Sequence, residues 1–131
     1  RARPFDVTLQ LTATGATVTA SHTGYQRLRP KVTHQRQWQI SAGALEVVDN
    51  FTGSFDRAVA YFHFHPSIEL SLASRDIVFT LPNGQRGVVE VQDGSVAVEQ
   101  SSWHPAFGLS QPSQKLAIDI EGNKLRTCFR Y

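Results

Sequence analysis

The sequence predicts an all-β protein, a two-layer antiparallel β-sandwich with about 10 to 12 short strands. Three observations lead to this prediction. Apolar residues recur at every second position along most of the chain, turn residues interrupt these runs at short intervals, and no stretch shows the apolar stripe of an amphipathic helix. So many short strands would leave apolar faces and open edges in a single layer, and we therefore expect two packed sheets.

The N-terminal part of the chain is expected to form four strands. Apolar and polar residues alternate in the first and the third of them, while β-branched and other apolar residues predominate in the second and the fourth. The pairs Thr14-Gly15 and Ala42-Gly43 are the turn signals between neighbouring strands. The expected strands cover residues 5–11, 17–20, 31–41 and 45–48.

The rest of the chain continues this pattern. Pro66 closes a long β-rich run, and Pro82-Asn83-Gly84 and Asp93-Gly94 are the strongest turn signals. Residues 103–114 lack alternation, and we expect them to be irregular. The expected strands cover residues 57–65, 68–73, 76–81, 87–91, 95–100, 115–120 and 124–130.

Length and composition limit what the chain can be. With 131 residues, of which 40% are hydrophobic and 18% charged, residues 1–131 are expected to form one domain with its own core. The net charge of +2 is far below that of a dedicated nucleic-acid binder, so nucleic acid is not an expected partner. The single cysteine, Cys128, excludes an internal disulfide, and no apolar run reaches the roughly 20 residues that span a bilayer. The chain opens with Arg-Ala-Arg-Pro and contains no methionine, which suggests a piece of a longer protein.

A histidine pair lies near the middle of the chain. His63 and His65 are two residues apart on an expected strand and therefore point to the same face. Such a pair binds a metal when a neighbouring strand supplies a third ligand, for which Asp49 and His34 are the candidates. The simpler interpretation is that the neighbouring phenylalanines fill the core while both histidines and Tyr61 lie on the outer face or against another domain. No metal ligand is assigned.

His34, Arg36 and Trp38 share one face of another expected strand. An aromatic ring beside Arg and His suits the apolar face of a sugar and its carboxylate or sulfate group. The structural alternative is that Trp38 belongs to the core and that Arg36 pairs with a carboxylate such as Asp49 or Glu46.

Two loops contain further candidate binding groups. Residues 21–31 combine a glycine, Tyr25 and several cations, and they suit either a polyanion or solvent. Residues 103–108 contain two aromatic rings that line a cleft or pack against the sandwich. The sequence contains no serine nucleophile elbow, no cysteine-based zinc pattern and no glycine-rich phosphate loop.

Taken in order, these motifs resemble those of the heparinase II/III-like polysaccharide lyases. They are His22-Thr23-Gly24-Tyr25, His34-Gln35-Arg36, Val47-Val48-Asp49, Phe62-His63-Phe64-His65-Pro66 and Trp103-His104-Pro105-Ala106-Phe107-Gly108. The resemblance covers nearly the whole chain. It implies the C-terminal part of a large, supersandwich-like antiparallel β-sandwich, which follows an N-terminal α/α toroid in that family. It also implies an activity of the whole enzyme, the β-elimination of uronic-acid-containing polysaccharides.

The resemblance further implies where the chemistry of such an enzyme lies. A tyrosine and a histidine come from the toroid, and a further histidine and the ligands of a structural zinc come from histidine-rich segments early in the sandwich. This sequence contains none of those motifs, so we assign it no catalytic residue, no metal ligand and no cofactor. The substrate-binding residues that we expect near the wall of the cleft are His34, Arg36, Tyr61, His63 and His65.

The leading hypothesis is an accessory, cleft-wall domain of a polysaccharide lyase. Its expected partners are the toroid of its own parent chain and an acidic polysaccharide, and its expected location is the periplasm or cell envelope of a bacterium. The alternative is a free-standing carbohydrate-binding module with an aromatic platform built from Trp38, Tyr25 and Trp103. A β-domain without any ligand is the third hypothesis.

Overall fold

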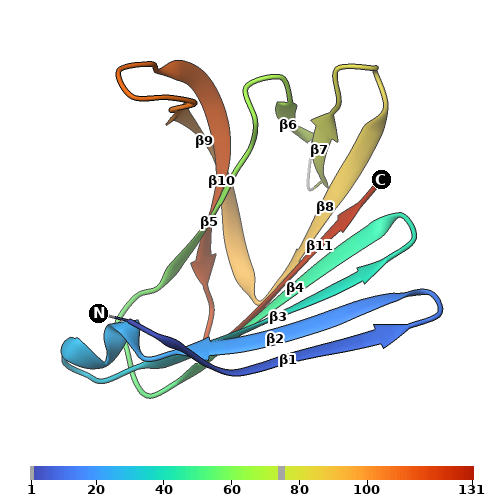
Figure 1. The fold of residues 1–131 in the computed structure, drawn as a ribbon. Helices are drawn as coiled ribbons and strands as arrows, with labels where there is room; N and C mark the ends of the chain where they lie inside the picture. Colours follow the sequence, from blue (N-terminus) through green and yellow to red (C-terminus); the bar gives the residue numbers. More distant parts are fainter. Residues whose placement is uncertain (1, 74–75) are drawn as a thin grey trace.

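This computed structural model describes residues 2–73 and 76–131, which contain eleven β-strands and one short 3-10 helix joined by turns and irregular segments (Figure 1). The all-β prediction is confirmed. Within these residues, no helix is long and apolar enough to cross a membrane. In chain order the elements are β1 (Pro4–Thr12), β2 (Gly15–His22), η1 (Gly24–Arg27), β3 (Thr33–Ser41), β4 (Ala44–Thr52), β5 (Val59–His63), β6 (Glu69–Ala73), β7 (Asp76–Thr80), β8 (Arg86–Gln92), β9 (Gly94–Trp103), β10 (Gln111–Ile120) and β11 (Lys124–Arg130).

The strands form two antiparallel sheets of unequal size. The larger sheet has the strand order β1-β2-β3-β4-β11-β8-β7-β6, and the smaller one has the order β5-β10-β9. In Figure 1 the larger sheet runs from β1 at the bottom to β6 and β7 at the top, and β5, β10 and β9 stand on the left. The predicted two-layer sandwich is confirmed.

The bend at Asp93-Gly94 transfers the chain from one sheet to the other. β8 pairs with β11 in the larger sheet, whereas β9 pairs with β10 in the smaller one. Asp93 has a positive φ of 63°, and a Cβ atom on Gly94 would lie 2.7 Å from Cγ2 of Ile118. Glycine is therefore required at the first residue of β9, where the backbone lies against Ile118 of β10.

Several of the expected strand limits are wrong: β2 and β4 extend beyond the expected 17–20 and 45–48, and β3 begins at Thr33 instead of residue 31. β5 covers Val59–His63 instead of residues 57–65. The irregular segment is shorter than 103–114, because β9 extends to Trp103 and β10 begins at Gln111, opposite Trp103. Pro112 fits into β10 because the strand on its other side, β5, pairs only from Lys115 onward, so the missing N–H of Pro112 breaks no ladder there.

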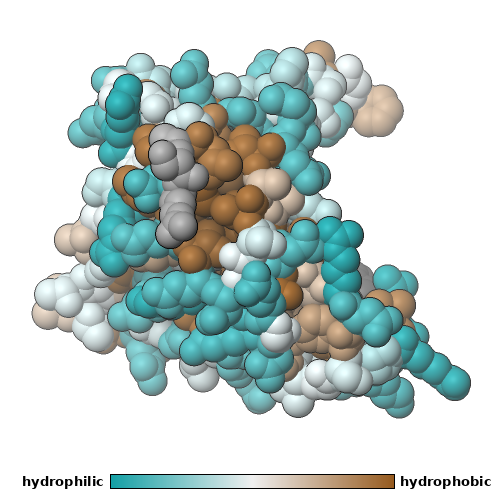
Figure 2. Space-filling view, turned by 180° about the vertical axis from the view of Figure 1, so that it is seen from behind, coloured by the Kyte–Doolittle hydropathy of each residue, from teal (hydrophilic) through white to brown (hydrophobic). Residues whose placement is uncertain are grey.

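The hydrophobic core lies between the smaller sheet and one half of the larger sheet. Its residues come from β5 to β8, β10 and β11, and Phe62 and Phe64 pack against them as predicted. On the back face of the molecule, an apolar patch reaches the surface and hydrophilic residues border it (Figure 2). The buried cluster consists of Ala60, Leu70, Ile77, Phe79, Val89, Leu116, Ile118 and Leu125.

The inner face of the larger sheet stays apolar beyond this core. Strand pairing aligns two rows of side chains across β1, β2 and β3, namely Leu9, Val18 and Trp38, and Leu11, Ala16 and Ile40. Leu11 at the edge of the sheet is 75% exposed, and Trp38, which the structural interpretation assigned to the core, is only half-buried. The smaller sheet therefore covers the β11-β8-β7-β6 half and leaves the β1–β3 half open.

We expect Leu116→Ala to lower the free energy of unfolding by roughly 2–5 kcal/mol, because Leu116 is fully buried and its truncation leaves a cavity between the sheets. Leu72→Ala is the matched control: it removes the same atoms from a side chain that is 53% exposed, and it should cost far less. Urea denaturation followed by circular dichroism measures both values. Equal losses would contradict this location of the core.

Candidate functional site

A pocket of about 820 Å³ opens between the η1–β3 region and the segment that leads into β5. Its walls combine imidazole, phenol and guanidinium groups with apolar side chains. The inner faces of β2 and β3 supply His22, His34 and Arg36, and the opposite wall supplies Arg57 and Tyr61. Cationic and aromatic groups, together with the carboxylate of Asp56, thus surround one space that is large enough for a small ligand.

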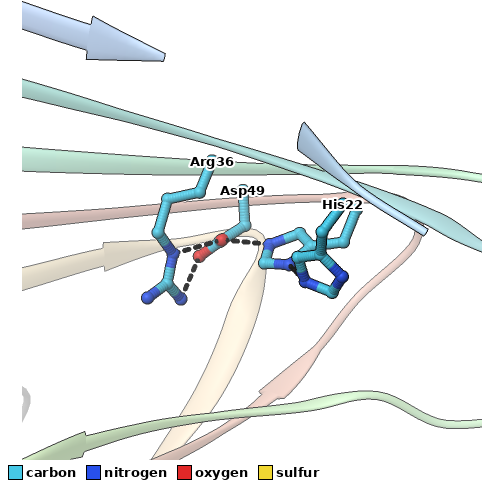
Figure 3. Close-up of polar contacts among 4 residues, drawn as sticks. His22, Arg36 and Asp49 are labelled. Atoms are coloured by element: carbon cyan, nitrogen blue, oxygen red, sulfur yellow. Dashed lines mark hydrogen bonds and ion pairs between the residues drawn. The ribbon is translucent and has the colours of Figure 1, made fainter. Parts of the chain in front are cut away.

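Strand register explains why the polar groups of β2, β3 and β4 meet. The hairpin closed at Ala42-Gly43 pairs Arg36 with Asp49, and the β2–β3 pairing sets His22 opposite His34. Directly paired residues point to the same face of a sheet with their Cβ atoms roughly 5 Å apart. The four side chains therefore form one connected network (Figure 3).

The carboxylate of Asp49 is the centre of this network. Arg36 donates to it twice, from Nε to Oδ1 at 2.6 Å and from Nη2 to Oδ2 at 3.0 Å, and Nε2 of His34 lies 2.5 Å from Oδ1. The Asp49 side chain is only 1% exposed. A carboxylate so deeply buried needs this paired cation and these hydrogen bonds to stay ionised. The structural alternative for Arg36, an ion pair with Asp49, is thus observed.

The backbone of Gly24 determines the tautomers of both histidines. Its N–H donates to Nδ1 of His22 at 3.1 Å, so the proton of a neutral His22 lies on Nε2. That proton points to Nδ1 of His34, 3.0 Å away, and the proton of His34 then lies on Nε2 and points to Asp49. Every nitrogen of the two rings is engaged, so neither ring offers a free lone pair to a substrate proton.

The pKa values of two members of the network follow from this environment. Burial lowers the pKa of His22 below its ordinary value, and the nearby His34 and Arg36 lower it further. Burial alone would raise the pKa of Asp49, but the hydrogen bonds and charges of His34 and Arg36 outweigh burial and hold that pKa below its ordinary value. The network therefore favours a neutral His22 beside an ionised Asp49.

Aromatic contacts complete the pocket wall. The ring of Phe51 stacks on that of His34 with a centroid distance of 4.6 Å, and the ring of Tyr25 lies 5.1 Å from that of His22. Phe51 was not among the residues that the sequence singled out. The signal was present in the Ala42-Gly43 turn, because counting outward from this hairpin turn sets residue 51 opposite His34.

The five predicted binding residues fall into two groups. His34, Arg36 and Tyr61 line the pocket. His63 and His65 lie farther along the chain from Tyr61 and are exposed, with His63 bonded to Ser101 and His65 to Ser67. The predicted outward orientation of Tyr61 and the two histidines agrees with their exposure.

The two candidate third ligands for a metal on His63 and His65 are used elsewhere. His34 and Asp49 bond to each other inside the network. In residues 2–73 and 76–131, no three side chains of His, Cys, Asp or Glu are grouped in a way that would hold a metal ion.

The three rings of the alternative aromatic platform have different neighbours. Trp38 lies half-buried in β3 between Val18 and Val47, Tyr25 packs against His22, and Trp103 packs against His65.

Comparison with protein families assigns the chain. Residues 2–131 match the family described as heparinase II/III-like, C-terminal. The chain belongs to this family. The recognition made from the ordered motifs is thereby confirmed, whereas a comparison with curated proteins found no match.

Solved structures of larger proteins share the fold of this heparinase II/III-like domain. The heparan sulfate lyase HepC from Pedobacter heparinus superposes with a TM-score of 0.75 at 12% identity over 99% of this chain and 21% of that protein. A heparinase III, the BT4657 gene product, superposes with a TM-score of 0.68 at 14% identity over 95% of this chain and 21% of that protein. The chain thus spans about a fifth of the length of these structures, and at such low identities the superpositions establish a shared fold alone.

We expect Asp49→Asn to lower the free energy of unfolding by about 3 kcal/mol, near the lower end of the cost of breaking a buried ion pair. The variant leaves the charge of Arg36 uncompensated, but Arg36 is 27% exposed and regains some hydration. The matched control is Asp119→Asn, which breaks the exposed ion pair with Arg57 and should change stability little. Urea denaturation at neutral pH compares the two. Similar losses would contradict a structural role of the buried network.

We also expect stability to decrease as the pH falls below about 6.5, the ordinary pKa of a histidine. The lowered pKa of His22 keeps the ring neutral in the folded chain while the unfolded chain already binds a proton there. The contribution of the neutral His22 ring to stability is therefore complete above pH 6.5, and it is lost as the pH falls towards the pKa of His22 in the folded chain. His22→Gln, which preserves a donor and an acceptor, should show a shallower dependence of the urea midpoint on pH. An unchanged slope would argue against this role of His22.

Proposed function

We propose that this chain is the cleft-wall part of a larger polysaccharide lyase that cleaves uronic-acid-containing polysaccharides by β-elimination. The observation that carries the proposal is the pocket, in which histidine, tyrosine and arginine side chains face one space. Membership of the heparinase II/III-like family and the fold shared with structures named as a heparan sulfate lyase and a heparinase III support it.

The pocket suits an acidic sugar in two ways. Tyr25 and Tyr61 are 44% and 50% exposed, and their rings offer apolar surface to the face of a sugar ring. Arg36 and Arg57 each use two N–H groups on an aspartate and retain others. These remaining donors suit a carboxylate or sulfate group of the substrate.

β-Elimination divides the chemistry between a base and groups that bind the carboxylate. The base removes the proton at C5, the electron pair of that C–H bond forms a double bond between C4 and C5, and the C4–O bond breaks so that its electrons leave with the oxygen of the departing sugar, which takes up a proton. Donors at the neighbouring carboxylate stabilise the negative charge that develops. Since the ring nitrogens of His22 and His34 are already bonded, we propose that the base comes from another part of the parent protein. This chain then binds and orients the polysaccharide.

If this chain binds the polysaccharide and another part of the parent protein supplies the base, the chain has two partners. The first partner is an N-terminal α/α toroid of the parent chain, which would form the opposite wall of the cleft against residues 1–131. The second is the acidic polysaccharide itself. We propose the periplasm or cell envelope of a bacterium as the location, because polysaccharides of the cell surface are the expected substrates.

In the full-length enzyme, alanine substitution of the proposed binding residues should raise KM or lower kcat, because each removes a contact to the substrate or to the wall that shapes its site. The substitutions are His34→Ala, Arg36→Ala, Tyr61→Ala, His63→Ala and His65→Ala. The ultraviolet absorbance of the unsaturated product, recorded with heparin, heparan sulfate and alginate, measures the rate.

Arg86→Ala, in β8 and away from the pocket, is the control and should retain the kinetics of the parent. Unchanged kinetics in all five variants would contradict the binding role. The isolated 131-residue chain should form no unsaturated product in the same assay, and product formation would contradict the proposal that the base lies elsewhere.

A further inference from the structure

We propose that the saccharide-binding surface extends out of the pocket, across Tyr61, onto a row of rings on the outer face of the smaller sheet. The row consists of Tyr61, His63, His65 and Trp103. The inference rests on the proposed function and deepens it, because it adds a second group of subsites. Only an acidic polysaccharide longer than the pocket would reach them.

Register places these rings on one face of the smaller sheet. Phe62 and Phe64 point inward and pack against the core, so Tyr61, His63 and His65 point outward. On the far strand, Ser101 bonds to His63, and Trp103, two residues later in β9, points to the same side as Ser101. The row therefore runs from the edge strand β5 across the sheet to β9.

The rings are close neighbours at both ends of the row. The ring centroids of Tyr61 and His63 are 6.5 Å apart, and those of His65 and Trp103 are 4.7 Å apart at an angle of 64°. Tyr61 is 50% exposed and Trp103 36%. From Tyr61 to His65 an extended chain spans about 13 Å, which is a distance that more than one sugar unit occupies.

Hydrogen bonds hold the two imidazoles before any ligand arrives. Nδ1 of His63 lies 3.2 Å from Oγ of Ser101. Nδ1 of His65 lies 2.7 Å from Oγ of Ser67 and accepts from the backbone N–H of Ser67 at 3.2 Å. Rings that are already oriented lose little side-chain entropy on binding, which favours affinity for a ligand that stacks on them.

Small residues and one cation lie beside the rings. Ala97 and Ala117 pair across β9 and β10, and Ala117 also pairs with Tyr61, so two small side chains lie beside Tyr61 on this face. Nζ of Lys115 lies 4.4 Å from the centre of the Tyr61 ring and 3.2 Å from a carboxylate oxygen of Glu99. An ammonium group in this position suits a carboxylate or sulfate between two stacked sugars.

Continuity with the pocket indicates a polysaccharide as the occupant of this face. Tyr61 belongs to both surfaces, since it lines the pocket and begins the row. The row also alternates ring faces with the polar atoms of His63, His65 and Lys115, which suits a chain of sugars that presents apolar faces and hydroxyl or acidic groups in turn.

The test compares oligosaccharides of two lengths on the 131-residue chain. We expect Trp103→Ala to weaken binding of a heparan sulfate decasaccharide by about three- to tenfold, the usual loss for one ring contact. The affinity of this variant for a tetrasaccharide, which fills only the pocket, should not change.

Two further variants are compared. Tyr25→Ala, within the pocket, should weaken binding of both the tetrasaccharide and the decasaccharide, and Trp103→Phe should bind the decasaccharide as the unmodified chain does. Isothermal titration calorimetry measures all of these affinities.

Phe107→Ala serves as the control, because Phe107 is a fully exposed ring that lies outside the row. Unchanged tetrasaccharide binding by the Trp103 variant also shows that it is folded. If Trp103→Ala leaves decasaccharide affinity unchanged, or weakens both lengths equally, the extended surface is wrong and the pocket still stands. If neither oligosaccharide binds the unmodified chain, this inference fails, whereas the proposed function, in which the parent chain supplies the opposite wall of the cleft, is tested by the kinetics of the full-length variants.

Discussion

The buried carboxylate of Asp49 is the constraint on which the pocket depends. Arg36 and His34 of the neighbouring strand bond to it. His34 in turn bonds to His22, and His22 accepts a hydrogen bond from the backbone of Gly24. One charge thereby joins β4, β3, β2 and the start of η1. Without a partner this carboxylate could not remain ionised in the interior, and the wall that positions Tyr25 and Arg36 would lose its support.

The unequal sheets explain why binding groups accumulate where they do. The smaller sheet covers the β11-β8-β7-β6 half of the larger one, and its edge strand β5 faces the uncovered inner side of β2 and β3. A pocket forms along that edge because no further strand of the smaller sheet fills it. Residues 61–65, which begin in β5 and continue two residues past its end, alternate phenylalanines toward the core with a tyrosine and histidines toward solvent. This short segment therefore contributes to both the core and the proposed binding surface.

Much of this could be predicted from particular residues. The alternation through β3 and the turn at Ala42-Gly43 predicted a hairpin, and the Arg36–Asp49 pair follows from its register. The inward phenylalanines and outward histidines of residues 61–65 follow from the two-residue period of an extended chain. The strand ends near Trp103 and Gln111 were missed, because Pro112 normally interrupts a sheet and only the absence of β5 beside it makes the position acceptable.

The sequence by itself determined the fold class, the family and the faces on which side chains lie, because a period of two and the order of short motifs are local properties of the chain. The tertiary structure decided which distant groups meet. It alone showed that the chain passes from the larger sheet to the smaller one between β8 and β9, and that the backbone of Gly24 determines the tautomers of two histidines. It also showed that Trp103 packs against His65. Contacts of this kind depend on the pairing of strands far apart in the chain, which local patterns do not encode.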